Sequence, residues 1–189
     1  METYSPEKIQ KTEFLPGTYV IYAMHGKCYL AGRETRTIGG VPIDFYKLEL
    51  KKAPLSRSQK QEPAIWVPVA HAQERGLRAA MSQPEAEAAL QILMSREYYF
   101  KLLDEPWSTL QPQLENTIRI EGGEGLAKVA SFLYVLAKKQ MVPSSDLLKF
   151  KENVFKLLLK EISDALCLNS KAIEEKIQKG LRSKLFTDS

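Results

Sequence analysis

Cysteine and long apolar runs are scarce in this sequence of 189 residues. Its two cysteines, Cys28 and Cys167, lie far apart and form no C-x-x-C pair, which predicts reduced thiols that pack as small apolar side chains. The longest apolar run, residues 132–137, is far shorter than the ~20 residues that a membrane-spanning helix needs. The first residues, METYSPEKIQKTE, contain no apolar stretch that resembles a signal peptide. We therefore expect a cytoplasmic protein that binds no membrane.

The sequence also lacks the motifs of catalysis and of metal binding. It contains no H-E-x-x-H, no G-x-S-x-G and no EF-hand spacing. The only histidines, His25 and His71, are better explained as turn or packing residues than as ligands. We therefore expect a binding protein that is not an enzyme and that uses no cofactor, no metal and no small-molecule substrate.

The charge balance is mildly basic, with 27 lysines and arginines against 23 aspartates and glutamates. Most of this small surplus lies in residues 107–189. Such a balance permits binding to nucleic acid without requiring it.

Residues 18–69 have the pattern of short β-strands. Four segments, TYVIYA, KCYLAGRE, IDFYKLEL and AIWVPV, are rich in β-branched and aromatic residues. Gly39 and Gly40 predict a two-residue hairpin turn, because glycine readily adopts the positive φ angles that such a turn requires. Residues 51–63 are polar and predict a long exposed loop. Four or five strands joined by tight turns favour a small barrel or a curled sheet.

After Pro68 the periodicity becomes that of α-helices. Ser82 and Glu85 form a capping box for a helix that is expected to run to about Leu103. Four more helices are predicted at about 110–121, after the glycines of 122–125, from Ser144 or Ser145, and from Asn169-Ser170. The predicted organisation is α+β: a tail (1–13), a β-barrel domain (14–80), a linking helix (81–106) and an all-α helical bundle (107–189).

The segment GGEGLAK, residues 122–128, is the nearest match to a phosphate-binding loop. It lacks the Gly-Lys-Ser/Thr ending and does not follow a predicted strand. A glycine turn at a helix start can nevertheless receive a phosphate oxygen, with Lys128 adding charge. A flexible interhelical turn is the favoured interpretation, and the phosphate site stays open.

Three motifs follow one another along the first half of the chain: FLPGTYVIYAMHGKC, ETRTIGG and WVPVAHAQERGLR. Their order and spacing resemble those of the CarD family of bacterial transcription regulators. The sequence resembles that family specifically over residues 14–95. It is more loosely similar to the family's helical C-terminal domain at EPWS, NTIRIEGG and KVASFL. The resemblance implies a Tudor-like (SH3-like) domain that binds RNA polymerase, joined to a helical domain that binds DNA.

The resemblance also implies roles for individual residues. Arg36 matches an arginine that contacts the polymerase β subunit, and we expect Thr35, Thr37 and Trp66 to contribute to the same surface. Trp107 matches a tryptophan that packs against promoter DNA at the upstream edge of the transcription bubble. The basic residues expected to contact DNA are Arg119, Lys128, Lys138 and Lys139.

Two departures from the family pattern bear on these roles. Ser108 and Thr109 replace a basic pair after the tryptophan, and this loss should weaken DNA binding and flatten its salt dependence. Trp66 stands where many relatives carry a basic residue, so it is either buried or an interface aromatic. Arg36 is alternatively an ordinary solvated hairpin charge.

Two hypotheses follow. In the first, the protein docks on the polymerase β subunit and stabilises the promoter open complex with Trp107, while tethering compensates for weak DNA contacts. In the second, the barrel still binds polymerase, but the helical domain binds a further protein partner and no DNA.

Overall fold

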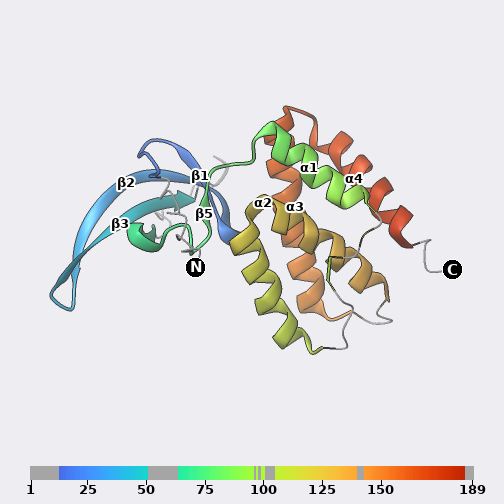
Figure 1. Cartoon of the computed structure of the whole chain (residues 1–189), viewed down its shortest axis with the longest axis horizontal. Helices are drawn as coiled ribbons and strands as arrows, with labels where there is room; N and C mark the ends of the chain where they lie inside the picture. Colours follow the sequence, from blue (N-terminus) through green and yellow to red (C-terminus); the bar gives the residue numbers. More distant parts are fainter. Residues whose placement is uncertain are drawn as a thin grey trace, which may run out of the picture.

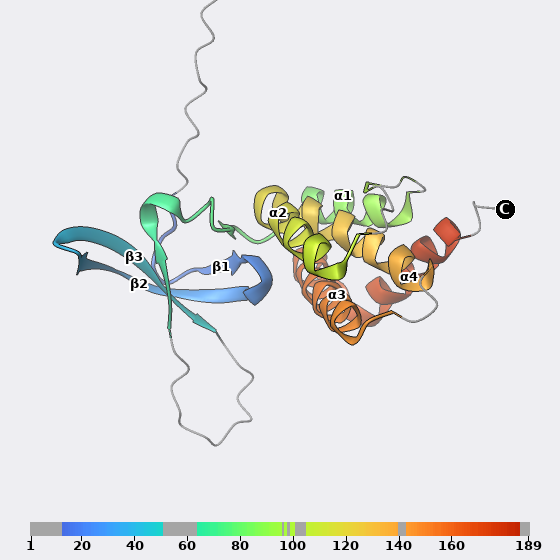
Figure 2. The ribbon, with the colours of Figure 1, turned by 90° about the horizontal axis from the view of Figure 1, so that it is seen from below.

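The computed structural model describes residues 13–50, 64–95, 97, 99–100, 105–139 and 143–185. They form two regions that lie side by side, a curved β-sheet built by the N-terminal part and a group of helices built by the rest (Figures 1 and 2). This arrangement confirms the predicted α+β class. The predicted loop 51–63 and residues 1–12 of the predicted tail lie outside the described residues.

The sheet is antiparallel and five-stranded, with the order β4-β3-β2-β1-β5. Its strands are β1 (Tyr19–Tyr22), β2 (Gly26–Ile38), β3 (Val41–Leu50), β4 (Ile65–Pro68) and β5 (Leu77–Arg78). The two long strands, β2 and β3, form a hairpin that extends away from the helices (Figure 1). Gly39 and Gly40 make its turn with φ angles of 59° and 82°, as predicted.

A small apolar core holds the sheet region together. Leu30, Leu48 and Val67, from three neighbouring strands, are fully buried. Cys28 is buried with them, and burial raises the pKa of its thiol to about 11. Cys167, in contrast, is exposed, so the prediction that both cysteines pack inside the protein is wrong for Cys167.

Helix α1 (Gln83–Met94) begins as the sequence predicts and ends earlier. The Ser82 backbone N–H donates to Glu85 Oε2 at 2.7 Å, and the Glu85 N–H donates back to Ser82 Oγ, which completes the capping box. The helix ends at Met94 because Ser95 is extended, with ψ of 156°, so the prediction of a helix reaching Leu103 is wrong. Ala86, Ala89 and Leu93 on α1 pack against the other helices.

Helix α2 (Trp107–Lys139) is two helical segments joined at one residue. Gly122 has a φ of 61° and a ψ of −125°, a conformation open to glycine and costly for other residues. The predicted break in the glycine-rich segment is therefore confirmed, although it is a sharp kink and not a loop. The first segment starts at Trp107, three residues before the expected position.

The last two helices start where the sequence predicts. Ser144 caps α3 (Ser145–Leu166) by accepting the N–H of Leu147 at 3.2 Å. Asn169 accepts the N–H of Lys171 at 2.9 Å beside the start of α4 (Ser170–Leu185). All four helices share one apolar core, whose most buried members include Leu93, Leu114, Leu133, Val154, Leu158, Ile162, Ile173 and Leu181. Within the described residues, no helix has the length and apolar character needed to cross a membrane.

Candidate functional site

The side chains of Arg36 and Trp66 lie together on the sheet. Arg36 is on β2 and Trp66 on β4, and the Arg36 guanidinium carbon lies 3.4 Å from the centre of the Trp66 ring. The Arg36 Nε also donates to Glu34 Oε1 at 3.1 Å. Although Arg36 is paired with Glu34, its side chain is still 42% exposed, so a partner can reach the guanidinium. A flat aromatic ring beneath a guanidinium orients that cation and supplies apolar area, a combination common at protein interfaces.

Thr35 and Thr37 lie on the face of the hairpin opposite to Arg36. Neighbouring side chains of a strand point to opposite faces, so the structure does not bring these threonines next to Trp66. The Thr35 hydroxyl donates to Asp44 Oδ1 at 2.6 Å, and Arg33 donates to the other oxygen of Asp44 at 2.6 Å. The hydrogen bonds from Thr35 and then Arg33 lower the pKa of Asp44. Thr35 therefore stabilises the hairpin that carries Arg36.

Trp107 is the first residue of α2 and is partly buried against the helical core. Its ring meets the ring of Phe150 edge-on, with 5.5 Å between centroids and 66° between the planes. Its Nε1 is buried, and no acceptor for it lies among the described residues. Ser108 and Thr109, which follow it, are exposed. The environment thus combines apolar packing with one polar atom that lacks a partner, an arrangement that costs free energy.

Lys128 is paired within α2. Its Nζ lies 2.8 Å from Glu121 Oε2 and 2.8 Å from Glu124 Oε1, across the kink at Gly122. The hydrogen bonds to Glu121 and Glu124 raise the pKa of Lys128 to about 12. Two carboxylates compensate this single charge and so reduce the attraction of Lys128 for a phosphate. This arrangement favours the interpretation of the glycines as a turn.

Arg119 lies on the side of α2 that faces the sheet. Its side chain hydrogen-bonds to Asn116, and a Cβ built at Gly76 would lie 3.1 Å from Arg119 Cγ. Gly76 precedes β5, so Arg119 packs where the two regions meet. It is exposed there beside His25 and Pro112.

Lys138, at the end of α2, belongs to a groove that also involves α3 and α4. Tyr134, Phe155 and Leu159 provide apolar lining. The charged side chains around them are four basic ones and two acidic ones: Lys138, Lys151, Lys156, Arg182, Glu152 and Glu174. Lys151 Nζ lies 5.9 Å from the centre of the Tyr134 ring, and burial together with nearby Lys138 lowers the pKa of Lys151. A bound anion would relieve this repulsion between like charges.

The sequence prediction included Lys138 and missed its three basic neighbours. They lie on helices 12 or more residues further along the chain, and their spacing alone gives no sign that they meet. Lys139, also predicted to contact DNA, is exposed beside Lys138.

Comparison with protein-family models identifies the sheet region. Residues 14–79 match the CarD-like/TRCF RID domain. The sheet region is therefore similar to this family of RNA polymerase-interacting domains. The match ends one residue after β5 and includes none of the four helices. A comparison with curated proteins found no match.

Proposed function

We propose that this protein is a transcription regulator that docks on the β subunit of RNA polymerase through Arg36 and Trp66. The observation that supports it most is the stacking of Arg36 on Trp66 at 3.4 Å within a CarD-like/TRCF RID domain. A guanidinium pairs with carboxylates through two parallel hydrogen bonds, so an acidic patch on polymerase is the expected counterpart. The Trp66 ring adds apolar contact area directly beside the ion pair.

We further propose that the helical domain contacts upstream promoter DNA and prolongs the life of the open complex. Lys138, Lys151 and Lys156 are the candidates for phosphate contacts, because they line one groove in which, together with Arg182, they outnumber the two carboxylates of Glu152 and Glu174. Trp107 is the candidate wedge through the part of its ring that the core leaves exposed. Stacking against a base contributes ~1–3 kcal/mol, and ~1.4 kcal/mol already changes an equilibrium tenfold.

A second candidate function is an adaptor whose helical domain binds another protein. Trp107 packs on Phe150 with its N–H buried, and Lys128 is neutralised by Glu121 and Glu124. Both observations reduce the surface available to DNA and favour this alternative. In either case the sheet region would bind polymerase.

Polymerase binding by a charge-reversed variant tests the docking surface. Arg36→Glu is expected to weaken binding to the cognate polymerase by ~30-fold or more, because it places a carboxylate against the expected acidic patch. Arg75→Glu is the matched control, since Arg75 is an exposed arginine of the same region and is not part of the Arg36–Trp66 pair. Binding is measured by surface plasmon resonance, and folding by circular dichroism.

The outcome of this experiment discriminates clearly. Binding of Arg36→Glu at the wild-type level would overturn the proposed docking surface. Equal losses for Arg36→Glu and Arg75→Glu would indicate a general charge effect in place of a site. The lifetime of open complexes, measured with and without the wild-type protein, tests the second part of the proposal.

A further inference from the structure

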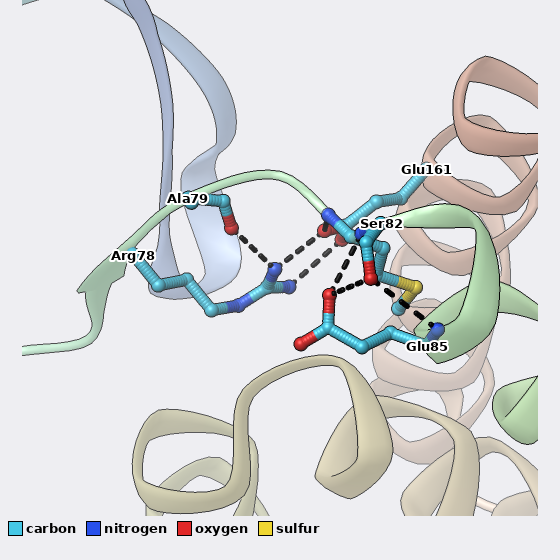
Figure 3. A network of polar contacts seen from close by, with 6 residues as sticks. Arg78, Ala79, Ser82, Glu85 and Glu161 are labelled. Atoms are coloured by element: carbon cyan, nitrogen blue, oxygen red, sulfur yellow. Dashed lines mark hydrogen bonds and ion pairs between the residues drawn. The ribbon is translucent and has the colours of Figure 1, made fainter.

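Arg78 connects the sheet region to the helices. It is the last residue of β5, and its guanidinium makes two parallel hydrogen bonds to the carboxylate of Glu161 on α3, of 2.5 and 2.8 Å (Figure 3). Glu161 is only 6% exposed, and it also accepts the backbone N–H of Met81 at 3.0 Å. The two residues lie 83 positions apart in sequence, so the pair joins two distant parts of the chain.

The kink of α2 at Gly122 packs directly against the side chain of Arg78. A Cβ added at Gly122 would lie 2.9 Å from Arg78 Cδ and 3.2 Å from Nε. The guanidinium is held by two hydrogen bonds to Glu161 and one to the backbone oxygen of Ala79, so this side chain cannot easily move aside. Arg78 therefore contacts α2 and α3 at the same time, directly before the linker 79–82 that leads into α1.

Two further contacts join the regions near this pair. Lys27 Nζ lies 2.9 Å from Asp164 Oδ2, and a Cβ added at Gly26 would lie 2.6 Å from Leu157 Cδ2. Both link the start of β2 to α3. Rotation of one region about the linker would break these contacts together with the Arg78–Glu161 pair.

We infer that Arg78 is a positioning residue, which with Glu161 fixes the orientation of the helical domain relative to the sheet. A bidentate ion pair is directional, whereas an apolar contact permits sliding. Fixed orientation means that a partner bound to the sheet meets the helical domain at one place, which raises the effective concentration of the second contact. The rigid joint follows from these contacts alone, and its use at a promoter rests on the proposed function.

Distances between two spin labels test the joint in the full chain. One label is placed on β3 by Glu49→Cys and the other on α4 by Lys176→Cys, in a background with exposed Cys167 changed to serine. The wild-type joint is expected to give one narrow distance distribution by double electron–electron resonance. The variant Arg78→Ala/Glu161→Gln removes both charges and retains an acceptor for Met81, and it is expected to give a broad or shifted distribution.

Arg33→Ala is the matched control, because Arg33 forms its ion pairs with Glu13 and Asp44 inside the sheet region. It is expected to leave the distribution narrow. An unchanged narrow distribution in the folded double variant would overturn the inference. If the double variant does not fold, Arg78→Lys decides, since one ammonium group cannot replace the two parallel bonds: broadening supports the joint, and an unchanged distribution rejects it.

Measuring polymerase binding by the same variants tests the role of the Arg78–Glu161 pair independently of the proposed function. Arg36 and Trp66 are untouched in these variants, so we expect wild-type polymerase affinity together with a shorter open-complex lifetime. Absence of polymerase binding by the wild-type protein would reject the proposed function, and the distance result would still decide the role of Arg78.

Discussion

The sheet region and the helical region each contain one described tryptophan, and the two side chains lie in different environments. Trp66 has the half-exposed guanidinium of Arg36 over its ring, where a partner can reach it. Trp107 has its ring against Phe150 and its N–H buried. A tryptophan covered by a charged side chain remains a binding surface, whereas one held by core residues contributes first to stability.

The largest expected effect is a difference in the free energy of unfolding between variants of these two tryptophans. Trp107→Ala is expected to lower the free energy of unfolding by about 2–4 kcal/mol, somewhat less than for a fully buried aromatic residue, because part of its ring is exposed. Trp66→Ala should cost less stability and should weaken polymerase binding. Chemical denaturation and binding measurements on both variants test this contrast.

The opposite effects on stability and binding would contradict the proposed difference between Trp66 and Trp107. If Trp107→Ala unfolds like the wild type and only shortens the open-complex lifetime, Trp107 acts on DNA and its packing is incidental. If Trp66→Ala loses stability and keeps polymerase affinity, Trp66 serves the sheet core.

A second effect uses the buried cysteine of the sheet. The Cys28 thiol keeps its proton up to a pH of about 11 in the folded protein, whereas in the unfolded chain it loses the proton near 9.0. Between these values the unfolded state binds fewer protons, so stability should fall as the pH rises, by about 2–3 kcal/mol in total. Denaturation at several pH values measures the fall.

Variants of the two cysteines identify the source of this pH dependence. Cys28→Ala should flatten it, and Cys167→Ser should leave it unchanged because Cys167 is exposed. A fall that persists in Cys28→Ala would assign the effect to other groups.

Local patterns in the sequence predicted much of the fold. The Gly39-Gly40 turn, the Ser82–Glu85 capping box and the starts of the last two helices depend on residues close together in the chain, and all are confirmed. The predicted end of α1 was wrong, because the backbone becomes extended at Ser95 without any glycine or proline there to signal it.

Contacts between distant residues were not predictable in the same way. Comparison with the family pattern singled out Arg36 and Trp66 one at a time, but only the structure shows that their side chains stack. The pairing of Lys128 with two glutamates across the kink, and the pair of Arg78 and Glu161, depend on how helices meet. Net charge and spacing do not reveal which cations are already neutralised.

The smallest expected effect compares two lysines of the same helix. Lys138→Ala should reduce the slope of log affinity for promoter DNA against log salt concentration by ~0.9, the value for one lost phosphate contact. Lys128→Ala should leave the slope unchanged, because Glu121 and Glu124 already hold this ammonium group. Fluorescence anisotropy with a forked promoter DNA, measured over a range of salt concentrations, gives both slopes.

Each possible result assigns the surface differently. A reduced slope for Lys138→Ala alone places phosphates in the groove where Lys138 and Lys151 repel each other. Equal reductions for both variants would mean that DNA crosses the kink of α2 and displaces the glutamates from Lys128. If neither variant changes the slope, phosphates contact neither lysine, and the protein-binding alternative for the helical domain becomes the better explanation of its basic groove.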